Sequence, residues 1–239
     1  MRLMACMFIN MVATNREKKP FIPCKIFVLL TLIGCVFIRT AGADDACAIK
    51  EIKRSEAPGV KVYAPDRKRF AVNKEDEKGT IQMYMGTEGS DTLTCITCED
   101  IEGGPKKRRH KMMPSWHPSG QWLFMSVERD KYAKPFLASW NKDLIEGWLQ
   151  CGIWTNMYAV SPDGKTWHRM TDFKSNVKGV ADGYTGPNFT PDGKQAVWSQ
   201  IIDGNVFKYW PFGRWDLILA DFEEVDGVPR FTNLRNITP

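Results

Sequence analysis

The sequence predicts an all-β fold, and two observations support that class. After residue 59 the chain consists of short runs rich in β-branched and aromatic residues, separated by Gly, Pro, Asp and Asn clusters, and no segment keeps an apolar period of 3.6 residues. The clearest runs are 68–73, 80–86, 121–127, 156–161, 195–200 and 215–221. All nine tryptophans also lie after residue 43, which suits large side chains packed between sheets.

These runs repeat as a unit. "APDRKRFAV" (64–72), "HPSGQWLFM" (117–125) and "TPDGKQAVW" (190–198) share a proline, a small or acidic residue, a turn residue, a basic or amide residue and an apolar strand. Each is followed by a second strand pair with a turn and a closing Thr. Four-stranded repeats of this kind are typical of β-propeller blades. We therefore expect a partial β-propeller of about three four-stranded antiparallel blades.

The expected boundaries follow from the repeat. Residues 44–59 form an N-terminal linker, 60–112 the first blade, 113–185 the second blade with a long insertion, and 186–239 the third blade. Three blades are fewer than the 4–8 of a closed ring. The ring is therefore expected to be incomplete, because the chain is a fragment of a longer propeller or because another chain supplies the missing blades.

The repeat resembles a known family. "FTPDGKQAVWS" (189–199), "WHPSGQWLFM" (116–125) and "YAPDRKRFAV" (63–72) are similar to the WD40-like (PD40) repeats of the TolB family, over about residues 60–239. The resemblance implies a propeller with a binding role like that of TolB-like proteins in the bacterial envelope. It also leaves a rival, because similar propellers gate serine peptidases or carry the active sites of polysaccharide lyases and hydrolases.

The first 43 residues predict a signal peptide. A basic segment precedes the 13-residue apolar run "IFVLLTLIGCVFI" (26–38), and the small residues "AGA" (41–43) follow it. The run is shorter than the roughly 20 residues that span a bilayer. The alternatives are a short membrane anchor, a buried core helix, or lipidation at Cys35 in "LIGC". We expect export to the periplasm or the extracellular space, with membrane association only through a lipidated Cys35 or an uncleaved signal.

The charge distribution argues against nucleic-acid binding. The net charge of +5 comes from the first 43 residues, and the rest of the chain carries equal numbers of acidic and basic residues. A nucleic-acid binder is expected to keep its positive excess in the folded part. The densest basic run, "KKRRHK" (106–111), is expected to be a solvated loop between blades, although a patch for lipid or polysaccharide is the alternative.

Four cysteines follow the leader: Cys47, Cys95, Cys98 and Cys151. An exported protein meets an oxidising compartment, so disulfides are expected, and four cysteines allow three connectivities. The C-x-x-C of Cys95 and Cys98 is a possible disulfide. Free thiols and a metal or redox role remain open, whereas covalent haem attachment is disfavoured because Glu99 stands where a His is required.

Turn chemistry explains the Pro-Asp-Gly-Lys motifs without catalysis. Proline presets φ, Asp accepts local backbone hydrogen bonds and Gly takes the left-handed position. The expected structural turn residues are Pro65, Asp66, Pro118, Gly120, Pro162, Asp163, Gly164, Pro191, Asp192 and Gly193. His110, His117 and His168 lack nucleophile motifs around them and are expected to be packing or surface residues. No catalytic residue, metal or cofactor is therefore expected.

The insertion in the second blade (129–156) and a shorter one (201–215) place aromatic residues among charges. Long loops on a rigid scaffold are common binding surfaces. The candidate binding residues are Trp140, Trp148, Trp154, Trp210 and Arg214. The alternative is that these aromatics fold inward and cap the blades. The function hypothesis is a non-enzymatic exported propeller that binds a protein or glycan partner through its loops.

Overall fold

The structure is a computed structural model that describes residues 61–132, 142–177, 180–209 and 212–239. The contacts within the chain separate a unit that ends at Ala57 from a second unit, Pro58–Pro239. The predicted signal peptide (1–43) and linker (44–59) lie outside the described residues. Everything below concerns the second unit.

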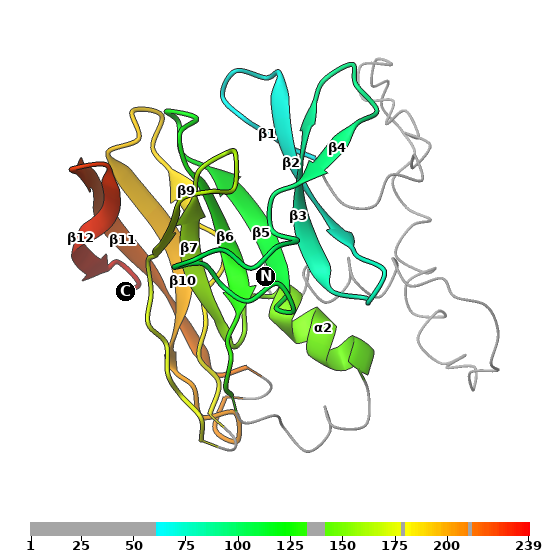
Figure 1. The fold of residues 1–239 in the computed structure, drawn as a ribbon. Helices are drawn as coiled ribbons and strands as arrows, with labels where there is room; N and C mark the ends of the chain where they lie inside the picture. Colours follow the sequence, from blue (N-terminus) through cyan, green and yellow to red (C-terminus); the bar gives the residue numbers. More distant parts are fainter. Residues whose placement is uncertain (1–60, 133–141, 178–179, 210–211) are drawn as a thin grey trace, which may run out of the picture. The chain divides into compact units, whose positions relative to one another are not determined.

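The described residues form three four-stranded antiparallel sheets, which confirms the predicted all-β class (Figure 1). The first sheet contains β1 (Val62–Tyr63), β2 (Arg69–Glu75), β3 (Ile81–Thr87) and β4 (Leu93–Cys95). The second contains β5 (Lys111–Trp116), β6 (Leu123–Glu128), β7 (Thr155–Val160) and β8 (Trp167–Arg169). The third contains β9 (Asn188–Phe189), β10 (Gln195–Asp203), β11 (Arg214–Val225) and β12 (Val228–Asn236). In each sheet the spatial order follows the chain, as in a propeller blade.

The second sheet begins slightly earlier than expected. Lys111 and Met112, placed at the end of the first blade by the sequence, belong to β5, the first strand of the second sheet. The pairing of β5 with β6 shifts register between Met112 and Ser115, and Met113 there has a φ of 53°. Such a bulge breaks the alternation of side chains, which hides the strand from a period-2 pattern.

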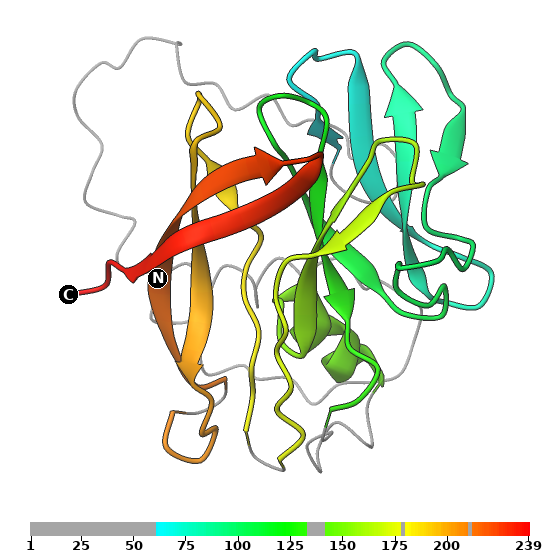
Figure 2. The same ribbon diagram turned by 60° about the vertical axis from the view of Figure 1, so that its left-hand side comes forward.

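The second sheet lies between the other two and is buried on both faces (Figures 1 and 2). Leu123 and Met125 of β6 pack in a cluster with Met83 of the first sheet. Phe124, which points the other way, packs with Trp198 of the third sheet. Burial of a large apolar side chain is worth roughly 1.5–3 kcal/mol. The two interfaces between sheets therefore form most of the core.

The four Pro-containing turns have the expected local chemistry. The carboxylates of Asp66, Asp163 and Asp192 each accept a hydrogen bond from the backbone N–H two residues later, and the Ser119 hydroxyl does so in the fourth turn. The glycine positions have positive φ, between 70° and 76°. They are Gly120, Gly164 and Gly193. In the first turn Arg67 takes that position with a φ of 54°.

One helix was not expected. Helix α2 (Lys142–Gln150) lies in the insertion between β6 and β7. Its apolar residues recur at helical spacing for only about two turns, which is too short to register as a sustained 3.6-residue period. Trp148 and Leu149 on the helix are buried in a third cluster together with Ile153 and Phe212. The insertion therefore caps one end of the sheets.

Candidate functional site

One face of the third sheet carries apolar side chains that lack a covering layer among the described residues. In β11 the buried Ile218 alternates with Leu217 and Leu219, which point to the opposite face. Val197 pairs with Leu219, and Ile237 lies opposite Leu217, to which its N–H donates a 2.9 Å hydrogen bond. We call Val197, Leu217, Leu219 and Ile237 the outer face of the third sheet. The exposed fractions of Leu217 and Ile237 are 44% and 45%.

Exposed apolar residues concentrate around this face. Six of the nine large hydrophobic residues that are exposed in the described part of the chain fall between residues 202 and 237. They are Ile202, Phe207, Leu217, Val225, Leu234 and Ile237. The strand β12 is also the outer edge of its sheet, and Figure 2 shows it arching across that side. An apolar patch next to an open strand edge is typical of a protein-binding surface.

A hollow of about 660 Å³ adjoins this face at the third Pro-Asp-Gly turn. Its lining residues are Thr190, Pro191, Asp192, Lys194, Gln195, Asp221 and Phe222. Hydrogen bonds from Thr190 and from the Lys194 backbone lower the pKa of Asp192. Hydrogen bonds from Gln195 and Asn233 likewise lower the pKa of Asp221. Both carboxylates are therefore charged at neutral pH, and Asp221 also pairs with Arg235 at 3.1 Å.

The aromatic residues of the insertions do not form an open binding surface. Trp148 and Trp154 are 8% and 3% exposed. The Trp154 ring stacks on Tyr132 at a centroid distance of 5.0 Å, and Trp148 meets Phe212 edge-on at 5.5 Å. Their position favours the alternative in which these aromatics cap the blades. Arg214 is exposed at the start of β11, and Trp140 and Trp210 lie outside the described residues.

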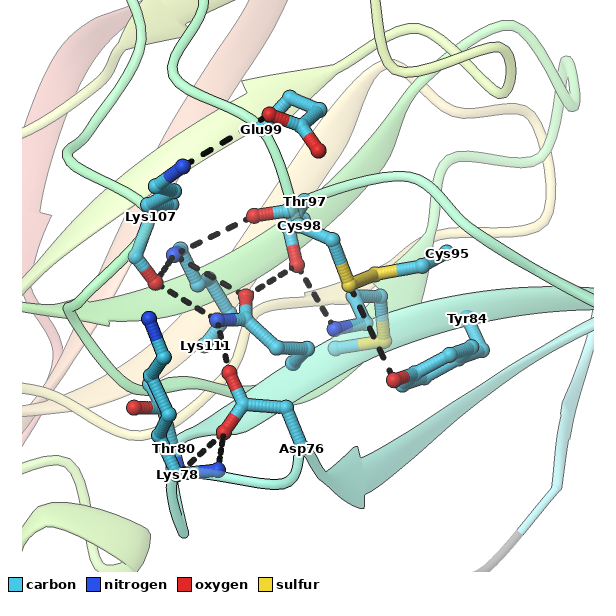
Figure 3. The surroundings of a disulfide bond; sticks show 12 residues. Asp76, Lys78, Thr80, Tyr84, Cys95, Thr97, Cys98, Glu99, Lys107 and Lys111 are labelled. Carbon is cyan, nitrogen blue, oxygen red and sulfur yellow. Dashed lines mark hydrogen bonds and ion pairs between the residues drawn. A yellow bond between two sulfur atoms is a disulfide. The ribbon is translucent and has the colours of Figure 1, made fainter.

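Lys111 is the main feature that the sequence did not reveal. It was expected in a solvated loop, and this expectation is wrong because the residue is fully buried. Figure 3 shows its ammonium surrounded by oxygen atoms. The Nζ atom donates to Gln82 Oε1 at 3.1 Å, to the carbonyl oxygens of Lys106 and Lys107 at 3.0 and 2.9 Å, and to the Thr97 carbonyl at 3.5 Å. One lysine therefore joins the first two sheets.

The Cys95–Cys98 pair forms a disulfide beside Lys111 (Figure 3). Thr97 lies inside this short loop, and its hydroxyl donates to Gln82 Oε1 at 2.7 Å and accepts from the backbone N–H of Met83 at 2.9 Å. The disulfide thus holds Thr97 against the strand that supplies Gln82. Its place in a buried hydrogen-bond network indicates a structural role.

The charge of Lys111 makes stability depend on pH. Burial lowers its pKa from 10.5 to about 8, and the nearby carboxylates of Asp100 and Asp76 partly oppose this shift. Between pH 8 and 10.5 the unfolded chain binds more protons than the folded chain, so stability rises with pH in that window. We expect the urea unfolding free energy to rise from pH 8 to pH 10.5 relative to the Lys111→Met variant. Parallel pH profiles of the two proteins would contradict this.

The rest of the basic run is also engaged. Arg109 Nε pairs with Asp130 at 2.9 Å and its NH1 with Glu128 at 3.4 Å. Lys107 Nζ lies 3.8 Å from Glu99 in an exposed pair. These contacts compensate the positive charges of the run locally and disfavour an anionic-ligand patch.

The histidines at the sheet interfaces have packing roles. His117 Nε2 donates to the Gly193 carbonyl at 3.0 Å, Nδ1 accepts from the Ser119 N–H, and the ring lies 4.3 Å from the Phe222 ring between centroids. His168 meets Trp122 edge-on, and burial lowers its pKa. Neither has a nucleophile geometry. Across the described residues, no group of three or more His, Cys, Asp or Glu side chains could hold a metal ion.

A buried ion pair at the other end of the second sheet was also missed from the sequence. Arg129 holds Asp182 with two nitrogens, at 2.9 Å from NH1 to Oδ2 and 2.7 Å from NH2 to Oδ1. Arg129 also donates to the Ser175 carbonyl at 2.8 Å. The pair ties the segment after β8 to the end of β6. It has no pocket beside it and indicates a structural clamp.

The part of the chain that the structure describes contains no helix with the length and apolarity needed to cross a bilayer.

Comparisons with known proteins place the chain near TolB structures. No protein-family model matches the sequence, and no curated protein is similar to it. A TolB structure from Agrobacterium tumefaciens is similar to 76% of this chain, with a TM-score of 0.48 and 17% identity, and the match spans 50% of that protein. A TolB from Acinetobacter baumannii is similar to 76% of this chain, with a TM-score of 0.45 and 13% identity, over 32% of its own length. The chain therefore spans half or less of the solved structures that it resembles.

Proposed function

We propose that the chain is a non-enzymatic β-propeller scaffold that binds a protein partner. The observation that supports this most is the outer face of the third sheet. In the first and second sheets the corresponding face is covered by the next sheet, whereas the third sheet leaves Leu217 and Ile237 nearly half exposed. An exposed apolar patch flanked by charged side chains such as Arg235 is the usual form of a protein interface.

A protein partner fits the site better than a glycan. Sugar binding by this chain would use open aromatic rings among charged residues. The two candidate tryptophans that the structure describes, Trp148 and Trp154, are buried in the core. The outer face is instead aliphatic, and aliphatic surface gains most from contact with another protein.

Export to the periplasm or the extracellular space belongs to the same proposal. The predicted signal peptide would deliver the chain to an oxidising compartment. The Cys95–Cys98 disulfide is of the kind that persists there.

A photo-cross-linking experiment tests the proposal. The photoreactive residue p-benzoylphenylalanine is placed at Leu217 in one variant and at the highly exposed Lys165, in the outer turn of the second sheet, in another. We expect cells that make the protein to give one defined protein adduct from position 217 after irradiation and none from position 165. Cross-linked peptides are identified by mass spectrometry. The absence of an adduct at position 217 would overturn the proposed function.

A further inference from the structure

The turns at the starts of the sheets stack on one another in a repeated way. A Cβ built on Gly120 of the second sheet would lie 3.7 Å from Pro65 Cδ of the first sheet. A Cβ built on Gly193 of the third sheet would lie 3.6 Å from Pro118 Cδ of the second sheet. Each turn therefore offers its proline to the glycine position of the turn that follows. By this rule Pro191 of the third turn offers the same contact.

A second position repeats in the same direction. Arg69, four residues after Pro65, faces the second sheet: its NH2 lies 3.3 Å from the Cβ built on Gly120. Trp122, four residues after Pro118, faces the third sheet, where its Nε1 donates to Glu224 at 2.8 Å. The third member of this series is Gln195, four residues after Pro191.

Gln195 and Pro191 both line the hollow beside the outer face. The hollow is thus the third copy of a contact that is filled twice within the described residues. Its shape is set by the same turn geometry, so its natural occupant is another turn of this kind.

The first turn is built to enter such a hollow. Arg67 takes its glycine position with a φ of 54° and is exposed. At that position a Cβ stands 3.6–3.7 Å from the receiving proline, which is ordinary van der Waals contact. At Gly193 the ring of His117, 2.7 Å from the added Cβ, would exclude a side chain. The smaller Thr190 replaces this His in the third turn and leaves room for one.

The charges of the two surfaces also match. Arg67 and Lys68 are exposed on the first turn. Asp192 and Asp221, both charged at neutral pH, line the hollow. Opposite charges on two facing surfaces favour the correct register of a contact and raise its association rate.

We propose that the hollow at the third turn binds the first turn of a second copy of this chain, with Arg67 against Asp192 and Asp221. This inference rests on the proposed function and names the protein partner. The same contact made twice by a two-fold axis would close two chains, with three described sheets each, into a ring. Six sheets fall within the 4–8 blades of known propellers.

Charge exchange across the contact tests the proposal. We expect the purified full chain to sediment at twice its mass of 27.3 kDa. Arg67→Asp and Asp192→Arg should each weaken self-association at least tenfold, because each places like charges together. The double variant Arg67→Asp/Asp192→Arg should restore the dimer, since it exchanges the charges across the contact. Analytical ultracentrifugation over a range of concentrations measures all four proteins.

The control variant is Asp163→Arg. Asp163 occupies the sequence-identical turn at the outer edge of the second sheet and makes the same two hydrogen bonds as Asp192, one to the lysine N–H two residues later and one to the preceding hydroxyl. Asp163→Arg therefore costs the same local turn stability and should leave the dimer intact. Equal dissociation by Asp163→Arg, or no rescue in the double variant, would overturn the proposal.

The result separates this inference from the proposed function. A single-chain mass at every concentration overturns the second-copy proposal. If position 217 then cross-links to a different protein, the proposed function stands without it. An adduct between two copies of this chain at position 217 supports both.

Discussion

Replacing Lys111 with alanine is expected to lower the free energy of unfolding by about 3 kcal/mol. The substitution removes the donor for four oxygen atoms, and those of Gln82 and Thr97 are buried where water does not replace the lost hydrogen bonds. A buried acceptor left without a donor costs about 1–3 kcal/mol. The carbonyls of Lys106 and Lys107 lie nearer the surface and recover part of the loss from water. Urea denaturation followed by tryptophan fluorescence measures the change.

Lys107→Ala is the matched control. It removes a lysine from the same basic run, but the Lys107 ammonium makes only a 3.8 Å pair with Glu99, and both side chains are at least half exposed. Exposed pairs of this kind contribute little, so the change should stay within about 0.5 kcal/mol. Equal losses for Lys107→Ala and Lys111→Ala would show that the buried network does not carry the stability assigned to it.

Gly152→Ala is expected to destabilise the protein by about 3 kcal/mol or more. Gly152 has a φ of 85°, and a Cβ there would lie 2.7 Å from the carbonyl carbon of Tyr184 and closer still to its oxygen. Tyr184 has no room to move, because it is fully buried and its hydroxyl donates to the Met125 carbonyl at 3.0 Å. The close approach brings the segment before β9 against the second sheet. Thermal unfolding followed by circular dichroism measures the loss.

Gly147→Ala, five residues earlier in α2, gives the opposite expectation. A Cβ at Gly147 meets nothing within 4 Å. Alanine in a helix is more stable than glycine by roughly 0.5–1 kcal/mol, so this variant should unfold at a higher temperature. If Gly152→Ala also kept or raised the stability, the close approach of the two segments would be wrong.

Local chemistry made the strands and turns predictable. The Asp side chain in each Pro-Asp-Gly turn bonds to a backbone N–H two residues away, as Asp163 does with Lys165 and Asp192 with Lys194. Such a turn needs nothing from the rest of the chain. The alternating apolar strands on either side follow the same rule of short range.

The insertion shows where short-range signals stop. Charged and aromatic residues alternate there, which suggested exposed rings. Trp148 is nevertheless covered by Phe212, and Trp154 by Tyr132, because tertiary contacts bring these partners together. The sequence contained both outcomes and no local term to decide between them.

The outer face of the third sheet did leave a signal that was not used. In "WDLILAD" (215–221) apolar residues occupy both faces of the strand, with Ile218 and Ala220 on one side and Leu217 and Leu219 on the other. A strand that is apolar on both faces is expected to be covered on both. The pattern therefore predicted a partner for that face, although not which one.

The sequence by itself determined the all-β class, the three four-stranded units and the turns, since these depend on residues within a few positions of one another. Tertiary structure alone decided that Lys111 is buried and that Pro191 borders an unfilled copy of a repeated contact. The physical reason is that burial and hydrogen-bond partners come from segments distant in the chain: Gln82 and Thr97 around Lys111, and Asp221 beside the third turn. A run of six basic and imidazole side chains carries no local record of which one the fold will enclose.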